Sequence, residues 1–199
     1  MSKVAADPIH PLLSQPFMRL IYHLWLSASS RKVRIFLAEK GLEFDLKVEK
    51  IWERRTEFLA MNPAGDVPVL IEPDGTTLTD SQVICEYLDE VYGAETPLLG
   101  NGPLQRAETR RLTTWFDQKF GKEVTDNLVG EKLMKRLLRL GAPDSRAIRA
   151  GRENLHIHMD YLAWLTERRN WLGGDWAMSL NDVCCYVPAW FGAIATFFL

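Results

Sequence analysis

Cysteine is scarce in this sequence. There are three in 199 residues, Cys85, Cys184 and Cys185, an odd number with two of them adjacent and all among apolar neighbours. This spacing fits neither a disulfide framework nor a metal-binding motif, so we expect no bound metal. Because disulfides are rare in a reducing compartment, the lack of a disulfide framework favours a cytoplasmic protein.

Neither sign of charge is in large excess. The formal net charge is −2, from 24 basic and 26 acidic residues, and it gives no indication of a nucleic-acid partner. The charges are unevenly spread, since residues 1–105 are net acidic and residues 106–170 net basic. This asymmetry suggests two modules. It fits either two ordinary solvated surfaces or a basic helical face that meets an acidic partner.

Long apolar runs are absent from the start of the chain. Residues 1–17 do not resemble a signal peptide, and we expect a disordered leader before a natural start at Met18. Residues 183–199 carry no charge and include Pro188. We expect this tail to be a truncated or frame-altered end of the last domain. A membrane anchor is the alternative, but the tail is short against the roughly 20 residues that a span needs.

Residues 18–95 show a pattern of short strands and helices. Apolar or alternating runs predict strands, and apolar residues at helical spacing predict helices, the first of them closed by Gly41. The expected strands are 20–26, 44–48, 67–72 and 76–78, the last two joined by a hairpin turn at Asp74-Gly75. The expected helices are about 31–40, 53–60 (helical or irregular) and 80–92. This β-α-β-α-β-β-α order predicts a thioredoxin-like domain.

The rest of the chain is helical in pattern. Residues 96–103 are rich in proline and glycine and predict a linker. The expected helices are 104–120, 128–140 and a third from Asp144 or Ser145 to about Arg169, after a break at 141–143. Ser179 and Asp182 form a Ser-x-x-Asp variant of the capping box. We therefore expect an α+β protein in which an all-helical domain, 104–199, follows the thioredoxin-like one.

Two segments carry the most information about function. Asn62-Pro63-Ala64-Gly65-Asp66-Val67-Pro68-Val69-Leu70 is a turn that ends in Val-Pro at the mouth of a strand. Asp80-Ser81-Gln82-Val83-Ile84-Cys85-Glu86-Tyr87-Leu88 is an N-cap followed by an amphipathic helix. Together with the Ser179–Asp182 box, in this order and spacing, they resemble the glutathione S-transferase superfamily from Met18 to about Asp182. The resemblance implies that superfamily's two-domain fold, a homodimer, and glutathione as substrate or vestigial ligand.

Three further segments resemble one branch of that superfamily. They are residues 48–55, 115–120 and 130–136, and the branch is the FtsZ-localised protein A group of alphaproteobacteria, which bind the division filament protein FtsZ. The resemblance implies a scaffold that binds FtsZ, with Lys132, Lys135, Arg136 and Arg139 as its partner-binding residues. The alternative is an active transferase that conjugates glutathione to a small electrophile.

The Val67-Pro68 bond is the first candidate binding element. An X-Pro bond costs only about 0.5–1 kcal/mol to hold cis. A cis bond here would turn the Val67 N–H and C=O outward, where they could pair with the backbone of a cysteinyl unit. A plain turn before a strand is the alternative.

Asp80 and Ser81 are the second candidate element. A helix start presents unpaired N–H groups and the positive end of a dipole, which suits a carboxylate. Ser81 would bind the glutamyl carboxylate of glutathione, and Asp80 its amino group. Asp80 could instead merely cap the helix, and the two roles can coexist.

The third candidate element is Ser27-Ala28-Ser29-Ser30. A redox enzyme would need cysteine here, so serine at both ends disfavours disulfide exchange. By resemblance to the serine-type transferases, the Ser27 hydroxyl would donate a hydrogen bond to the glutathione sulfur and stabilise its thiolate. Tyr22 is the alternative hydroxyl, and a helix cap without a substrate is the alternative role for Ser27.

Aromatic residues suggest a second-substrate pocket. Its candidate lining is His23, Trp25, Trp52 and Trp115, although core packing is the simpler interpretation of Trp115. His156 and His158 lie two apart on a predicted helix and do not share a face, which argues against a metal pair.

Overall fold

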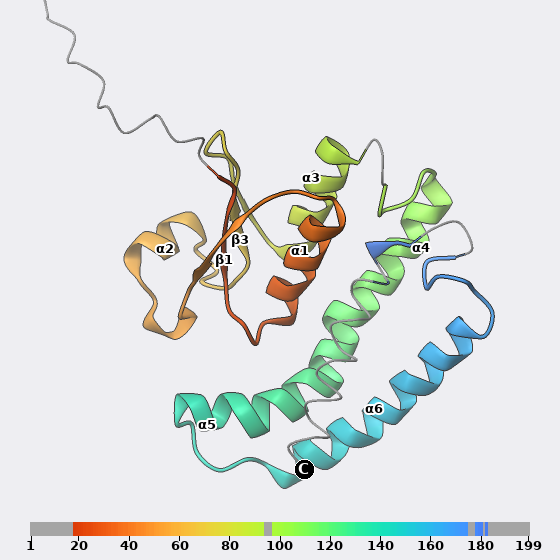
Figure 1. Ribbon diagram of the computed structural model, residues 1–199. Helices are drawn as coiled ribbons and strands as arrows, with labels where there is room; N and C mark the ends of the chain where they lie inside the picture. Colours follow the sequence, from red (N-terminus) through yellow and green to blue (C-terminus); the bar gives the residue numbers. More distant parts are fainter. Residues whose placement is uncertain (1–17, 94–96, 175–177, 181, 183–199) are drawn as a thin grey trace, which may run out of the picture.

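The computed structural model describes residues 18–93, 97–174, 178–180 and 182. The expected leader and the apolar tail, with Cys184 and Cys185, lie outside the described residues. Figure 1 shows a small sheet domain beside a domain of long helices. None of the described helices is both long enough and apolar enough to cross a membrane.

The first domain confirms the expected β-α-β-α-β-β-α order. Its elements are β1 (Leu20–His23), α1 (Ala28–Glu39), β2 (Asp45–Val48), the short η1 (Ile51–Glu53), α2 (Thr56–Met61), β3 (Val69–Ile71), β4 (Thr77–Thr79) and α3 (Ser81–Tyr92). The strand order in the sheet is β2-β1-β3-β4. Strand β1 runs parallel to β2 and antiparallel to β3, which in turn pairs antiparallel with β4. This is a thioredoxin-like sheet.

Helices cover both faces of this sheet. Because neighbouring side chains on a strand point to opposite faces, Ile21 of β1 packs into the cluster that contains Val33 of α1 and residues of α3. The next residue, Tyr22, packs on the other face against Phe58 of α2, with the ring centroids 5.7 Å apart. The alternation within β1 therefore divides the domain into two apolar layers.

Three local features shorten or end the predicted elements. Strand β1 ends at His23 rather than at residue 26, because the Ser27 N–H donates to the Leu24 carbonyl at 3.0 Å and turns the chain. Gly41, with φ of +64°, follows α1 as predicted for a C′ glycine. The predicted hairpin turn at Asp74-Gly75 is also confirmed, with Gly75 at φ of +88°.

The helical domain differs from the prediction in one respect. Its elements are α4 (Pro103–Thr114), η2 (Trp115–Met134), α5 (Lys135–Leu138) and α6 (Ser145–Thr166). The separate helices expected at 104–120 and 128–140 are one continuous run, in which η2 takes the wider turns of a π-helix. A glycine inside a helix costs only about 1 kcal/mol. Burial of Phe120, Val124 and Leu128 beneath α6 offsets that cost at Gly121 and Gly130.

One apolar cluster joins the two domains. It contains Ile21 and Phe36 of the sheet domain together with Leu112, Phe116 and Leu165 of the helical domain, all at most 4% exposed. The predicted capping box is also present, because the Asp182 carboxylate accepts hydrogen bonds from the Ser179 N–H and hydroxyl at 2.8 and 3.0 Å. This shared core fixes the position of η2 relative to α1, and the candidate site lies between them.

Candidate functional site

Strand register brings the predicted binding elements to one end of the sheet. Val69 pairs with Tyr22 of β1 on one side and with Thr79 of β4 on the other. Since both pairings are antiparallel, continuing them by two residues brings Val67 level with Leu24 on one side and Ser81 on the other. The end of β1, the Val67-Pro68 bond and the start of α3 therefore lie next to one another.

The Val67-Pro68 bond is cis, as the sequence predicts. Both residues are buried, and the Val67 side chain packs with Tyr22, Phe58 and Val69 on the α2 face of the sheet. The turn before them is held by Asn62, whose amide nitrogen donates to the Asp66 carbonyl at 2.9 Å and to its carboxylate at 2.7 Å. The Asn62 hydrogen bonds therefore hold the turn before Val67-Pro68, and apolar packing holds Val67 itself.

Asp80 caps α3. Its carboxylate accepts hydrogen bonds from the Gln82 and Val83 N–H groups at 2.8 and 3.1 Å, although its own backbone has a φ of +70°. A left-handed conformation is uncommon for a residue with a side chain, and it orients the cap at the start of the helix. Ser81, the first residue of α3, is buried at 7% exposure. A short acidic ligand at this helix start would meet the positive end of the α3 dipole.

Ser27 caps α1 and also faces a cavity. Its hydroxyl oxygen accepts a hydrogen bond from the Ser30 N–H at 3.1 Å, while Ser30 is buried and its hydroxyl accepts from the Leu24 N–H at 3.4 Å. A hydroxyl that accepts one bond still has its own proton to donate. The cap and a contact to a ligand are therefore compatible at Ser27.

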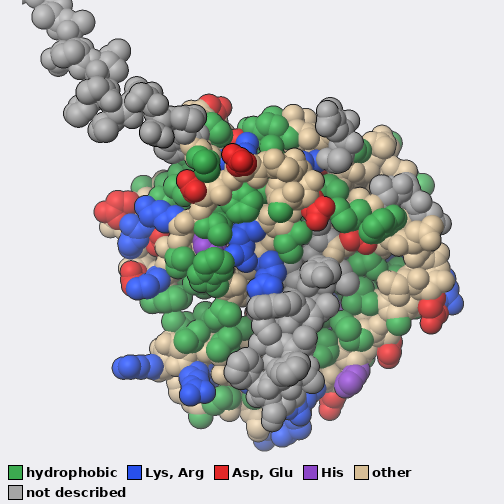
Figure 2. Space-filling view, in the orientation of Figure 1, with side chains coloured by type: hydrophobic (Ala, Val, Ile, Leu, Met, Phe, Trp, Pro, Cys, Tyr) green, Lys and Arg blue, Asp and Glu red, His purple; other side chains and the backbone are tan. Residues whose placement is uncertain are grey.

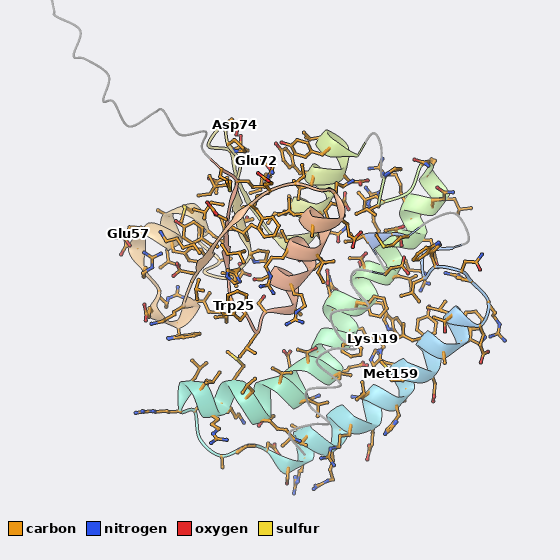
Figure 3. All side chains as sticks on the ribbon, in the orientation of Figure 1. Trp25, Glu57, Glu72, Asp74, Lys119 and Met159 are labelled. Atoms are coloured by element: carbon orange, nitrogen blue, oxygen red, sulfur yellow. The ribbon has the colours of Figure 1, made fainter. Side chains whose placement is uncertain are left out.

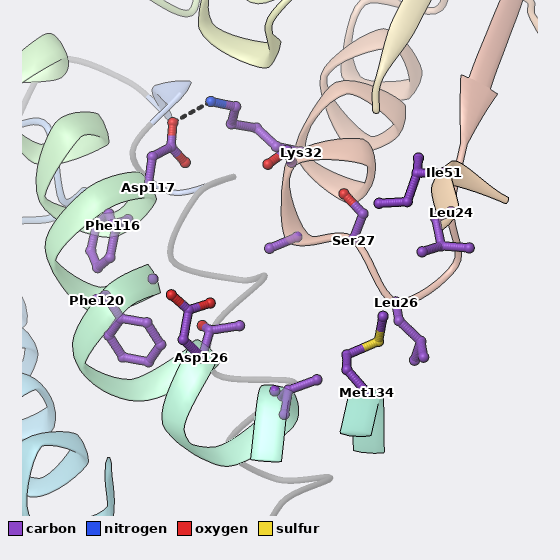
Figure 4. A pocket seen from close by; sticks show the side chains of 16 residues that line it. Leu24, Leu26, Ser27, Lys32, Ile51, Phe116, Asp117, Phe120, Asp126 and Met134 are labelled. Carbon is purple, nitrogen blue, oxygen red and sulfur yellow. Dashed lines mark hydrogen bonds and ion pairs between the residues drawn. The ribbon is translucent and has the colours of Figure 1, made fainter. Parts of the chain in front are cut away.

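The cavity lies between the two domains and has a volume of about 310 Å³. Figure 4 shows Ser27, Leu24 and Ile51 on the side of the sheet domain, facing Phe116, Phe120, Asp126 and Met134 of η2. The wall is mainly apolar but includes polar and charged side chains, a combination that suits a small-molecule site. The polar lining residues are Ser27, Ser29, Lys32, Asp117, Thr125 and Asp126. Neither Val67 nor Ser81 lines this cavity; they lie beside it, at the same end of the sheet.

An ion pair across the domain boundary borders the cavity. The Lys32 ammonium of α1 pairs with the Asp117 carboxylate of η2, and the Lys32 side chain is 2% exposed (Figure 4). Sequence reasoning missed both residues, because nothing in the local pattern indicates that positions 85 residues apart meet. The only available signal was a lysine within the apolar stripe of α1.

The aromatic residues predicted for a second-substrate pocket do not line the cavity. Trp25 is 55% exposed and Trp52 is 45% exposed, whereas His23 is fully buried with the Trp25 ring against it. Figure 3 shows Trp25 at the lower end of the sheet domain. Burial, and then the nearby Arg34 charge, lower the pKa of His23. Trp115 packs against the core cluster, which agrees with the expectation that it is a core residue. The prediction failed because strand and helix spacing does not specify how far a side chain reaches.

The alternative hydroxyl, Tyr22, lies on the other face of the sheet. Its ring is 8% exposed, and its oxygen accepts a hydrogen bond from the Lys47 ammonium at 3.4 Å. It is not among the residues that line the cavity. Cys85 is fully buried, and burial raises the pKa of its thiol to about 12, so it stays a neutral thiol. Within the described residues, no group of three or more His, Cys, Asp or Glu side chains could hold a metal ion.

The predicted partner-binding residues lie at the end of the long helical run. Lys132 belongs to η2 and Lys135 and Arg136 to α5, while Arg139 follows α5 in a left-handed conformation. Lys135 is paired with Glu131 at 2.6 Å. Burial and the charge of Arg152 lower the pKa of Lys132. Three of the four cations therefore remain without a carboxylate partner among the described residues.

This chain is similar to known proteins in both sequence and structure. A family model described as the glutathione S-transferase N-terminal domain matches residues 26–91. Over 167 residues the chain is 44% identical to FtsZ-localized protein A of Caulobacter vibrioides, covering 82% of this chain and 72% of the relative. A glutathione S-transferase crystal structure from Rhodospirillum rubrum F11 has a TM-score of 0.83 at 53% identity, covering 86% of this chain and 77% of that one.

A structure described as FzlA from C. crescentus has a TM-score of 0.81 at 43% identity, covering 85% of this chain and 76% of that one. These matches extend well past residue 91, so the likeness includes the helical domain as well as the thioredoxin-like one. Both domains, their order and their arrangement agree with the matched structures. The chain belongs to the glutathione S-transferase superfamily and to its FtsZ-localized protein A branch.

Proposed function

We propose that this protein is a cytoplasmic scaffold with the glutathione S-transferase fold that binds FtsZ filaments in bacterial cell division. The observation that carries the proposal is the 44% identity to FtsZ-localized protein A over 167 residues. This identity covers 82% of the chain, so it includes the helical domain as well as the candidate glutathione site. The basic end of the helical domain, with Lys132, Lys135, Arg136 and Arg139, is the proposed contact.

Co-sedimentation tests this proposal. FtsZ is assembled with GTP and pelleted, and the protein is expected in the pellet in proportion to the polymer. The matched control is FtsZ with GDP, which does not assemble and should leave the protein in the supernatant. A protein that stays in the supernatant at every concentration of polymer would exclude filament binding.

Glutathione binding is a second candidate, favoured by the position of Ser27. This residue lies at the N-terminus of α1 and faces the cavity of about 310 Å³, next to the sheet end where Val67, Pro68, Asp80 and Ser81 meet. In this proposal Ser81 binds the glutamyl carboxylate, Asp80 the amino group, and the backbone of Val67 the cysteinyl unit. The Ser27 hydroxyl donates to the sulfur, and the positive end of the α1 dipole favours the thiolate.

Retention on glutathione resin and conjugation of a chromogenic electrophile test this second function. Ser27→Ala should lower turnover and leave most of the glutathione affinity, because Ser81 and Val67 provide the other contacts. Ser29→Ala is the matched control, since Ser29 lines the same cavity but does not cap α1. Equal turnover in Ser27→Ala and the unaltered protein would exclude Ser27 as the donor. A homodimer, proposed from the superfamily, is measured by sedimentation equilibrium.

A further inference from the structure

The cations of the helical domain fall into two groups. Toward the start of α4 and the end of α6, basic side chains pair with carboxylates: Arg106 with Glu90, Arg110 with Glu86, Arg111 and Arg169 with Glu108, and Arg168 with Glu167. At the opposite end, several cations have no carboxylate partner within the described part of the chain, and they include Lys132, Arg136, Arg139, Arg149 and Arg152. We call these five residues the basic surface.

Helix packing brings the members of the basic surface together. Helices η2 and α6 approach closely at Gly151, where an added Cβ would lie 2.8 Å from the Asn127 Cβ. The same approach brings Arg152 of α6 near Lys132 of η2, and the charge of Arg152 adds to burial in lowering the pKa of Lys132. Arg149 and Arg152 are three residues apart and share one face of α6. Like charges from two helices therefore face one another across the contact.

Two carboxylates close in sequence to the basic surface, those of Glu131 and Asp144, are engaged in other contacts. Glu131 pairs with Lys135 and accepts a hydrogen bond from the Asp144 N–H at 2.7 Å. Asp144 caps α6 through the Arg146 N–H at 2.8 Å. Glu153, beside Arg152 on α6, is exposed. The excess of positive charge is therefore not balanced within this part of the molecule.

Two exposed leucines lie within the same stretch of chain. Leu137 is 56% exposed and Leu140 is 66% exposed, on either side of Arg139. Figure 2 shows blue and green side chains along the lower edge of the molecule, where Figure 1 places α5 and the start of α6. Leucines contribute little to a phosphate contact, whereas a protein segment with acidic and apolar side chains can use both. The combination favours a protein partner over a nucleic acid.

We infer that the basic surface binds an acidic segment of the filament partner, whose apolar side chains lie against Leu137 and Leu140. This inference rests on the proposed function and names the chemistry of its contact. The mutual repulsion of Lys132 and Arg152 is relieved when a carboxylate lies between them. Such a contact speeds association and weakens with salt, because it depends on exposed charges.

The test compares two triple variants of equal charge in co-sedimentation with FtsZ polymers. The first, Lys132→Gln/Arg149→Gln/Arg152→Gln, removes three charges from the basic surface. The second, Arg106→Gln/Arg110→Gln/Arg168→Gln, removes three cations from the opposite end. We expect the first to bind at least roughly tenfold more weakly, with a smaller dependence on salt, and the second to bind as the unaltered protein does. Thermal unfolding checks that both are folded.

The outcomes separate this inference from the proposed function. If the unaltered protein does not sediment with polymers, the proposed function fails and this inference fails with it. If all three proteins sediment equally, FtsZ binding stands and the basic surface is excluded as its contact. Flotation with phosphatidylglycerol vesicles and gel shift with duplex RNA complete the test. If the first triple variant loses binding to the vesicles or to the RNA but still binds FtsZ polymers, the proposed contact with an acidic segment is overturned.

Discussion

The Lys32 ammonium donates a hydrogen bond to the Asp117 carboxylate across the boundary between the two domains. The Lys32 side chain is 2% exposed, whereas that of Asp117 is 33% exposed. A buried ammonium is costly unless it is paired, while a partly exposed carboxylate can be solvated by water. The two ends of this ion pair are therefore unequal in what they contribute to stability.

This inequality predicts the effect of removing either partner. Asp117→Asn removes the carboxylate that pairs with this buried ammonium and should lower the free energy of unfolding, by at most roughly 3–5 kcal/mol. Lys32→Met should cost less, because its removal leaves only a carboxylate that water can reach. The measurement is urea unfolding of both variants and of the double variant. A double variant less stable than Asp117→Asn alone would contradict this account.

Helix caps provide the second prediction. Ser27→Ala removes the bond to the Ser30 N–H, and Asp80→Ala removes two bonds at the start of α3. Loss of such a cap typically lowers the free energy of unfolding by about 1 kcal/mol. For a domain of this size, that corresponds to a fall of a few degrees in the melting temperature. Ser27→Asn and Asp80→Asn retain a capping oxygen and serve as controls. Equal melting temperatures for the alanine and asparagine variants would show that the caps contribute nothing.

Much of the fold could be predicted from the sequence, because its signals are local. Gly41, Asp74-Gly75 and the Asp80 cap each depend on the backbone preferences of one or two residues, and all three are confirmed. The continuous helix from Pro103 to Leu138 could not be predicted in the same way. The pattern around Gly121 and Gly130 is that of a break, and only packing beneath α6 overrides it.

The candidate site was harder to predict than the fold. Val67 and Ser81 are brought together by strand register, which the hydrophobic pattern constrains, so their proximity was foreseeable. The cavity wall depends on how η2 lies against α1, and nothing local in the sequence sets that. For this reason Phe116 and Met134 line the cavity, while Trp25 and Trp52, which sequence reasoning favoured, are on the surface.

Glu108 provides a prediction about pH. Hydrogen bonds from Arg111, opposed in part by burial, and then from Arg169 lower the pKa of its carboxyl from 4.5 to about 2. Since the folded pKa is below the unfolded one, the stabilisation is complete above pH 4.5 and is lost as the pH falls toward about 2. Glu108→Gln should therefore be less stable than the unaltered protein at pH 7, by on the order of 2 kcal/mol.

The pH dependence distinguishes this effect from a simple loss of packing. The difference in unfolding free energy between the two proteins should shrink steadily below pH 4.5, the range over which the carboxyl binds its proton. Urea unfolding from pH 7 to pH 3 measures this difference. A gap that stays constant over that range would mean that the charge of Glu108 does not stabilise the fold. Glu167→Gln, which alters a more exposed carboxylate, is the control.

Trp115 and His158 lead to the last prediction. The indole N–H of Trp115 donates to His158 Nδ1 at 3.0 Å, and His158 Nε2 lies 3.0 Å from a Glu123 carboxylate oxygen. Because an indole can only donate, Nδ1 must accept, and the ring proton is on Nε2, directed at Glu123. Nitrogen NMR of the ring should therefore show the Nε2-protonated tautomer at neutral pH. A spectrum with the proton on Nδ1 would contradict the assignment.

The same geometry predicts the cost of removing the donor. Trp115→Phe leaves Nδ1 of a 1% exposed histidine without its hydrogen bond, and an unsatisfied buried acceptor costs about 1–3 kcal/mol. The urea concentration at the unfolding midpoint should therefore fall. The NMR signal of the Nε2-protonated tautomer should weaken, because Nδ1 no longer accepts a hydrogen bond from the indole. His156→Ala is the matched control, because His156 is exposed on the same helix and should change neither. If Trp115→Phe unfolds at the midpoint of the unaltered protein, the hydrogen bond does not stabilise the helical domain.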